Sequence, residues 1–323
     1  MESATKNKQS DDEILKMVQK AFGDDITSEV ITIKELTEGF FNVAYEIVLP
    51  DKRVILKIAP PQQAKIMRYE KNIMKAEVEA LRLVKSSTSV PVPEVIYYDE
   101  TGDVCKSNYF FMEKIEGDSF FQLKDKGLIP YETQNQIYQE MGRLNKEMNQ
   151  IKGTSFGYLG MPEKQSENWK EVFLQMVEEL LQDGEYIEIS LGVAYDEVRN
   201  LIGRASFSLE EVSVPTFVHW DLWDGNVFVK DGKITGIIDF ERALWAEPLM
   251  EFNFRAHVNI KDFYEGYGAN LREAAPIRAL LYDLYLFLIM TIETKYRMYE
   301  DDWQYNFASK QLIIAMDALK KLV

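Results

Sequence analysis

Apolar and polar positions alternate in short runs over the first third of the chain, and this alternation predicts strands. The runs cover residues 30–36, 43–49, 53–58, 95–99 and 108–112. An amphipathic pattern over 11–22 predicts a short helix before them, and a longer one over about 65–85 predicts a helix between the third and fourth runs. We therefore expect a small antiparallel sheet with one long helix.

From residue 131 onward the apolar spacing is mostly helical. Helices are expected over 131–151, 168–181 and 193–202, and, after an intervening stretch of hairpins, again up to residue 323. The chain is thus expected to be of the α+β class, with an N-terminal part over 1–113 and a larger, mainly helical part over 114–323. Residues 1–10 are polar and are expected to be disordered.

Three polar side chains stand at the ends of apolar runs in the second half of the chain. The first run leads into His219-Trp220-Asp221-Leu222-Trp223-Asp224-Gly225-Asn226, and the second into Ile238-Asp239-Phe240-Glu241. In kinases, a loop Asp accepts the proton of the attacking hydroxyl, while an Asn and a second Asp hold Mg²⁺. The spacing assigns these roles to Asp221, Asn226 and Asp239. Simple hairpin turns are the alternative interpretation, but they leave two carboxylates beside apolar runs unexplained.

One cation lies inside an apolar strand, at Lys57 of Val54-Ile55-Leu56-Lys57-Ile58. A Lys in this setting contacts the α- and β-phosphates in kinases. It needs an anionic partner, and Glu77 shares a helix face with Leu81 and Val84, which is expected to pack inward. Glu70 and Glu79 are the alternatives.

The loop and the Asp239 segment resemble those of the aminoglycoside phosphotransferase and choline kinase superfamily, and the resemblance extends from about Ile31 to Glu251. It implies a bilobal, protein-kinase-like fold. It also implies that Gly39 and Asn42 belong to a loop covering the nucleotide. By the same resemblance, backbone groups of Glu113 and Ile115 bind the base.

The acceptor side carries weaker signals. The polar residues expected to face a substrate are Asp224, Glu241, Glu247 and Glu251. The chain also departs from the family pattern in this region. Asn145 replaces a His, Trp220 replaces a Gly, and Glu247 and Glu251 replace Asp. His219 is expected to brace the loop by hydrogen bonds rather than to act as a base.

Composition adds a few limits. The formal net charge is −16, which argues against a nucleic-acid partner and favours cationic ligands. One cysteine excludes an intramolecular disulfide. The start lacks the pattern of a secretory signal, and the longest apolar stretch, 284–292, is shorter than the roughly 20 residues that span a bilayer. We expect a cytoplasmic protein without a membrane partner.

Together these features predict a Mg²⁺-dependent kinase that uses ATP or GTP to phosphorylate a hydroxyl of a small acceptor with possible amino groups, such as an aminoglycoside. A metabolic kinase of choline, a sugar or an amino alcohol is the alternative. A protein kinase is disfavoured, because the Gly-rich loop and the Ala-Pro-Glu segment are absent from the sequence. A catalytically silent nucleotide-binding module also stays open, as does the oligomeric state.

Overall fold

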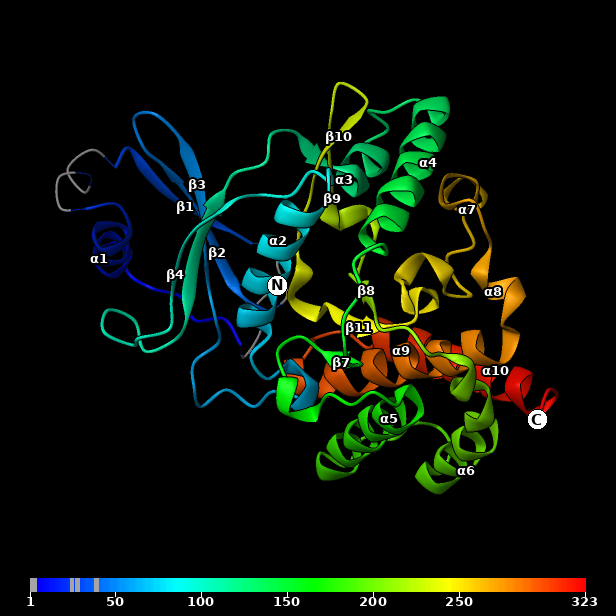
Figure 1. Cartoon of the computed structure of the whole chain (residues 1–323). Coiled ribbons are helices and arrows are strands. Elements are labelled where there is room, and N and C mark those ends of the chain that lie inside the picture. The colour runs from blue at the N-terminus through cyan, green and yellow to red at the C-terminus, as the bar shows by residue number, and fades with distance from the viewer. Residues whose placement is uncertain (1–4, 24–25, 27–29, 38–40) are drawn as a thin grey trace.

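The structure, a computed structural model, describes residues 5–23, 26, 30–37 and 41–323. Five strands form an antiparallel sheet in the order β1-β2-β3-β5-β4 (Figure 1). Their bounds are β1 Thr32–Leu36, β2 Val43–Val48, β3 Arg53–Ile58, β4 Val95–Asp99 and β5 Tyr109–Glu113. The sequence prediction of a small antiparallel sheet is confirmed.

Helices cover both faces of this sheet, α1 (Asp11–Phe22) on one side and α2 (Ile73–Ser87) on the other (Figure 1). In β3, Val54, Leu56 and Ile58 share a core with α1, whereas Ile55 belongs to the core that includes α2. Because side chains alternate along a strand, Lys57 lies on the face of Ile55 and points toward α2. The alternation thus aims the Lys57 side chain toward the centre of the protein.

The long helix is shorter than the sequence suggests. It begins at Ile73, and a separate 3₁₀ turn, η2 (Arg68–Glu70), precedes it. Two features interrupt the helical path. Asn72 adopts a left-handed conformation with φ 59°, and the Glu70 carboxylate accepts a hydrogen bond from the Met67 amide at 2.8 Å. Glu70 therefore does not share the helix face of Glu77.

Residues 5–10 differ from the expectation of disorder. The Thr5 hydroxyl donates to the Phe41 carbonyl at 3.0 Å, and the Lys6 ammonium donates to the Asn42 carbonyl at 2.7 Å. Asn7 donates to the Ala59 carbonyl at 3.0 Å. These side chains fix the segment because they satisfy carbonyls at the ends of β2 and β3. Residues 1–4 lie outside the described residues.

The remaining helices form the larger part of the protein. Their bounds are α3 Phe120–Asp125, α4 Tyr131–Met148, α5 Trp169–Tyr186, α6 Tyr195–Ala205, α7 Lys261–Tyr267, α8 Leu271–Ala274, α9 Pro276–Arg297 and α10 Trp303–Lys320. Helix α9 is buried on nearly all sides, as expected for a helix that is apolar around its whole circumference. None of the helices in the described ranges combines the length and apolarity that crossing a membrane requires.

Two small antiparallel sheets carry the polar loops. One has the order β10-β9-β6 and the other β7-β11-β8. Their strands are β6 Asp118–Ser119, β7 Gly157–Tyr158, β8 Thr216–Val218, β9 Val227–Lys230, β10 Lys233–Ile237 and β11 Leu244–Ala246. Strand β8 leads into the loop of Asp221, and β10 leads into Asp239. Because β9 pairs with β10, the loop before β9, which contains Asp221, lies close to Asp239 after β10.

Candidate active site

His219 connects the loop after β8 to the end of β10. Its Nδ1 accepts a hydrogen bond from the Asp221 amide at 3.2 Å, and its Nε2 lies 3.0 Å from the Ile238 carbonyl. Since Nδ1 accepts, Nε2 must carry the proton and donate. Burial lowers the pKa of His219, which keeps the ring neutral in this role. The expected bracing of the loop is confirmed.

Trp220 has φ 74°, a left-handed conformation that side chains other than glycine rarely adopt. The conformation costs about 1 kcal/mol or more, which explains why a Gly suits this position in the resembling family. The indole is buried, and it contacts the Arg242 guanidinium, 5.4 Å from the ring centre, and the Tyr285 ring, 6.4 Å away. These contacts offset the backbone strain.

Asp221 follows directly, and its side chain is partly buried. The side-chain amide of Asn226 donates to the backbone carbonyl of Asp221 at 2.9 Å and to the Asp221 carboxylate at 3.4 Å. Burial raises the pKa of Asp221 to about 7; Arg242 opposes the rise, and the charge of Asp239 adds to it. A carboxylate with a pKa near neutrality can accept a proton and release it again.

Lys57 links the five-stranded sheet to the segment after β10. Its ammonium lies 2.6 Å from Glu77 Oε1 and 2.9 Å from Asp239 Oδ1. Burial alone would lower the pKa of Lys57, but the Asp239 and Glu77 carboxylates raise it above its usual value. Of the candidate partners, the structure places Glu77 against Lys57, whereas Glu79 is exposed.

Three carboxylates meet beside Lys57, from Glu77, Asp239 and Glu241, with oxygens within 4.8 Å of one another. Burial, together with the charge of Asp239, raises the pKa of Glu241. Glu77 Oε2 is buried and has no hydrogen-bond partner among the described residues. This donor set fits a divalent cation that prefers hard oxygen ligands. Sequence reasoning had assigned Glu241 to substrate binding, but its position beside Asp239 favours a metal-binding role.

The loop between β1 and β2 reaches the same carboxylates. Asn42 donates from its side-chain amide to Glu241 at 2.8 Å, and the Phe41 ring lies under the Arg297 guanidinium at 4.3 Å. Asn42 is therefore close to the acidic cluster, as expected of a residue in a loop over the phosphates. Gly39, predicted to shape this loop, lies outside the described residues.

Glu113 ends β5, and Ile115 follows before β6 begins. The Glu113 amide donates to the Glu94 carbonyl at 2.9 Å, so it is not available to a nucleotide base. The Ile115 side chain packs against Gly236 and fills the space that a side chain at position 236 would need. The two residues occupy the connection between the five-stranded sheet and the helical part, where the base-binding prediction puts them.

Glu251, a predicted substrate residue, is fully buried behind the loop. Its Oε2 accepts from Asn145 at 3.0 Å and from the Trp220 amide at 3.2 Å. Its Oε1 accepts from the amides of Leu222 at 3.2 Å and Phe252 at 3.0 Å. These contacts favour a positioning role, in which Glu251 holds the loop that carries Asp221. They also explain how Asn145 is accommodated, since it donates to this carboxylate.

Asp224 and Glu247 have internal partners as well. Asp224 pairs with Lys124 at 2.5 Å and accepts from the Tyr138 hydroxyl at 2.7 Å, which ties the loop to α3 and α4. Glu247 accepts from Tyr282 at 2.7 Å and pairs with an arginine of α9. Both side chains are thus occupied by structural contacts, which favour an architectural role over the predicted contact with substrate.

Sequence reasoning missed Arg242. This partly buried residue of η6 (Phe240–Arg242) lies against two aromatic rings, with its guanidinium 5.6 Å from the centre of Tyr69 and 5.4 Å from that of Trp220. It also lies 3.4 Å from Glu293. Glu70 and Arg297 form a second buried pair nearby. No spacing in the sequence indicates these contacts, because they join residues of different elements.

The fold and the position of the polar cluster define a protein-kinase-like phosphotransferase fold, with a small sheet on one side and helices on the other. The sequence model of the phosphotransferase enzyme family matches residues 32–286. The chain belongs to this family, as its loop motif suggested. Comparison with curated protein sequences gives no match.

Solved structures resemble the chain over nearly its whole length. A suggested fructosamine-3-kinase from Haemophilus somnus 129PT is 18% identical with a TM-score of 0.68, covering 94% of this chain and 96% of that one. A thermostable mutant of the aminoglycoside phosphotransferase APH(4)-Ia, in complex with ADP and hygromycin B, is 16% identical with a TM-score of 0.67, over 95% and 98%. The streptomycin–ATP complex of APH(2″)-IIa is 17% identical with a TM-score of 0.61, over 97% of each chain. These likenesses concern the fold.

Proposed function

We propose that the protein transfers the γ-phosphoryl group of ATP or GTP to a hydroxyl group of a small molecule. The observation that carries this proposal is the ion-pair network of Lys57, Glu77 and Asp239, because it joins the sheet to the segment after β10. Asp221 is close enough to Asp239 for the charge of one to shift the pKa of the other. Lys57, the cation proposed to bind the phosphates, and Asp221, the base proposed for the acceptor hydroxyl, therefore belong to one site.

In the proposed reaction, Asp221 takes the proton of the acceptor hydroxyl as its oxygen attacks the γ-phosphorus. The bond between the γ-phosphorus and the bridging oxygen breaks, and the nucleoside diphosphate leaves with that electron pair. Lys57 holds the α- and β-phosphates, and Glu77 keeps the Lys57 ammonium in place. His219 and Glu251 fix the loop so that the Asp221 carboxylate stays aligned.

Asn226 and Asp239 are the proposed ligands of Mg²⁺, and Glu241 joins them because of its place in the acidic cluster. When bound, the cation neutralises negative charge on the phosphates and on the leaving diphosphate. The residues of the chain supply the oxygens that hold it. Asp239 would then serve both as an ion-pair partner of Lys57 and as a ligand of the cation.

Two kinds of acceptor have support from similar proteins. The complexes with hygromycin B and streptomycin favour an aminoglycoside. The likeness to a suggested fructosamine-3-kinase favours a metabolic acceptor that combines a sugar and an amine. A catalytically silent nucleotide-binding module is the alternative from another class, and an intact Lys57, Asp221 and Asp239 argue against it.

A coupled nucleotide-turnover screen tests the proposal. ATP and GTP are offered in turn with aminoglycosides, choline, sugars and amino alcohols, and Asp221→Asn serves as the control. We expect at least one acceptor to stimulate turnover in the natural protein and none in the variant. Tight binding of nucleotide and Mg²⁺ without stimulated turnover by any acceptor would favour the silent module instead.

A further inference from the structure

The N-terminal segment, which we define as residues 5–9, holds the backbone where the chain enters β2. The Thr5 hydroxyl donates to the Phe41 carbonyl at 3.0 Å. The Lys6 ammonium donates to the Asn42 carbonyl at 2.7 Å. Phe41 and Asn42, which we call the loop end, close the loop between β1 and β2 that is predicted to cover the nucleotide. The proposed mechanism gives the N-terminal segment no role.

The N-terminal segment is itself fixed to the five-stranded sheet. The Asn7 side-chain amide donates to the Ala59 carbonyl and to the Ser107 hydroxyl, both at 3.0 Å. The Gln9 backbone amide donates to the Tyr45 hydroxyl, also at 3.0 Å. Because these bonds anchor the segment, the donors that hold the loop end start from a fixed position.

The side chains of the loop end contact the helical part of the protein. The Asn42 side-chain amide donates to Glu241 at 2.8 Å. The Phe41 ring lies under the Arg297 guanidinium at 4.3 Å, and Arg297 forms a buried ion pair with Glu70. The loop end is therefore held from two directions, its backbone by the N-terminal segment and its side chains by the helical part.

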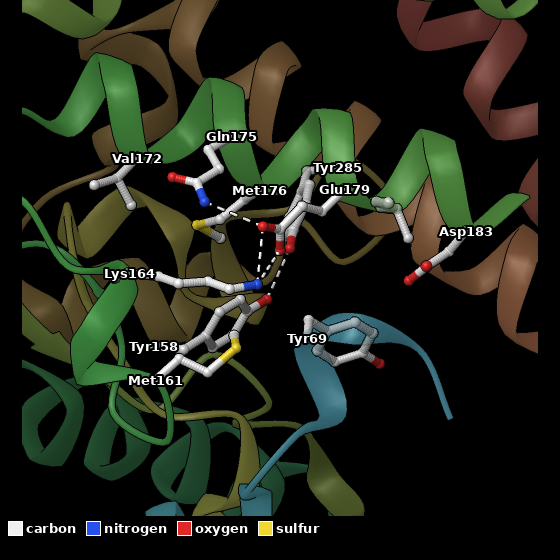
Figure 2. A pocket seen from close by; sticks show the side chains of 12 residues that line it. Tyr69, Tyr158, Met161, Lys164, Val172, Gln175, Met176, Glu179, Asp183 and Tyr285 are labelled. Atoms are coloured by element: carbon white, nitrogen blue, oxygen red, sulfur yellow. Dashed lines mark hydrogen bonds and ion pairs between the residues drawn. The ribbon is translucent and has the colours of Figure 1, made fainter. Parts of the chain in front are cut away.

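The turn that carries Glu70 is fixed to the helical part as well. Its Arg68 amide donates to Asp183 of α5 at 2.7 Å. Its Tyr69 ring stacks on that of Tyr158, with centres 5.8 Å apart, at the edge of a small cavity lined by α5 (Figure 2). The side chains of the loop end therefore meet a fixed frame, and they reach it only while the backbone of the loop end stays in place.

Asn42 has an acceptor that the protein does not use, next to a proposed ligand of the cation. Its side chain is buried, and its Oδ1 has no hydrogen-bond partner among the residues that the structure describes. Burying a polar oxygen without a partner is unfavourable. Since the nitrogen of the same amide donates to Glu241, this oxygen is available to a group that enters with the nucleotide.

Lys6 also brings a positive charge to this region. Burial lowers the pKa of Lys6, and the carboxylates of Glu35 and Glu241 oppose that shift. Lys6 and Glu241 are therefore near enough for their charges to interact. The N-terminal segment thus adds a cation to the surroundings of the proposed metal site.

We propose that Lys6 is a positioning residue for the phosphoryl donor. By holding the Asn42 carbonyl, it keeps the loop end beside Glu241 before the nucleotide arrives. A binding site that is already ordered loses less conformational entropy when its ligand binds, so the nucleotide binds more tightly. This inference rests on the proposed phosphotransferase function and adds to it a residue that is distant in sequence from the loop.

Calorimetric titration of Lys6→Met in the full chain, with Mg²⁺ and non-hydrolysable analogues of ATP and GTP, tests the proposal. We expect the affinity for the better-bound analogue to fall about tenfold, the worth of one hydrogen bond from a charged donor. Lys6→Arg keeps a charged donor and should recover part of the loss. Amide hydrogen exchange over residues 41–48 should be faster in Lys6→Met without any nucleotide, because the loop end has lost a backbone contact.

Steady-state kinetics separate positioning from a merely structural role. In Lys6→Met the nucleotide KM should rise about as much as the affinity falls. Since saturating nucleotide orders the loop end by itself, kcat and the acceptor KM should stay within about threefold of the natural values. A residue that only stabilises the fold would instead lower the melting temperature of the nucleotide-free protein and change all three constants together.

Lys8→Met is the matched control. It removes the same kind of side chain from the same segment, but the Lys8 ammonium pairs with Glu35 of β1, at 3.3 Å, and not with the loop end. Nucleotide affinity and the hydrogen exchange over residues 41–48 should stay as they are in the natural protein.

The outcomes separate this inference from the proposed function. Unchanged nucleotide affinity in Lys6→Met, or an equal loss in Lys8→Met, overturns the role of Lys6, and acceptor-stimulated turnover in the same preparations would then keep the phosphotransferase function. The expected loss in Lys6→Met alone, without turnover by any acceptor, supports the role of Lys6 in nucleotide binding and overturns the function. A natural protein that binds neither analogue overturns both.

Discussion

The two parts of the candidate active site differ in the contacts that hold their residues in place. On the nucleotide side, which we define as Lys57, Glu77, Asp239 and Glu241, charged groups pair across elements at 2.6 to 2.9 Å. On the acceptor side, which we define as Tyr69, Trp220 and Arg242, the two rings contact one guanidinium, whose carboxylate partner is Glu293 at 3.4 Å. One set of residues is thus held by ion pairs around a single ammonium group, whereas the other is held mainly by contacts between aromatic rings and a guanidinium.

The largest effect is expected from Lys57→Met. It leaves the buried Glu77 carboxylate and the partly exposed Asp239 carboxylate without their cation, which typically costs about 3 kcal/mol when one partner of a buried pair is removed. Nucleotide turnover should fall by about 100-fold or more, because the donor phosphates lose their contact. Denaturant unfolding and the coupled assay measure the two effects. Lys75→Met, on an exposed face of α2, is the control and should change neither. Turnover within about threefold of the natural protein would remove Lys57 from the site.

Glu251→Ala separates positioning from substrate binding. The change leaves Asn145 and the amides of Trp220 and Leu222 without their acceptor, so we expect a loss of about 2 to 3 kcal/mol in unfolding free energy. We also expect kcat to fall about tenfold or more with little change in nucleotide affinity. Glu251→Gln should recover part of both losses. If instead stability stays constant and only the acceptor KM rises, Glu251 is a substrate residue.

The pH profile is expected to follow Asp221. Burial raises its pKa to about 7, and only the deprotonated form accepts a proton. Below that pH, kcat/KM for the acceptor should therefore fall about tenfold for each pH unit, and above it the value should level off. Steady-state rates from pH 5.5 to 8.5 measure this at roughly half-unit steps. A flat profile over that range would contradict the assignment of Asp221 as base.

Trp220→Gly should have the smallest effect on catalysis and should act on the acceptor side. Loss of the indole costs several kcal/mol in packing, but glycine removes the strain at φ 74°. The Gly variant should therefore be about 1 kcal/mol more stable than Trp220→Ala, which keeps the strain. In both variants we expect a several-fold rise in acceptor KM with an unchanged nucleotide KM. A change confined to nucleotide KM would instead place Trp220 on the nucleotide side.

Much of the nucleotide side could be predicted from the sequence, because short-range patterns determine it. Alternation in β3 aims Lys57 at α2, and the helical period puts Glu77 on the inward face. The loop from His219 to Asn226 is contiguous, so its internal hydrogen bonds follow from its own spacing. These elements needed no knowledge of the tertiary packing.

The acceptor side could not be predicted in the same way. Arg242, Tyr69 and Glu293 meet from three different elements, and no periodicity relates them. The sequence analysis predicted that the acidic residues Asp224, Glu247 and Glu251 contact a substrate. Each is bound instead by partners in α3, α4 or α9, or by loop amides. Which carboxylates remain available depends on long-range contacts, and sequence spacing does not report them.

Single-turnover phosphoryl transfer in Asp221→Asn, with nucleotide binding measured on the same samples, tests the central claim most directly. Asp224→Asn is the matched control, because it makes the same chemical change three residues away at a structural carboxylate. We predict nucleotide affinity within about threefold of the natural protein in both variants. We also predict a transfer rate at least about 100-fold lower in Asp221→Asn alone. Transfer at the natural rate in Asp221→Asn would contradict the account.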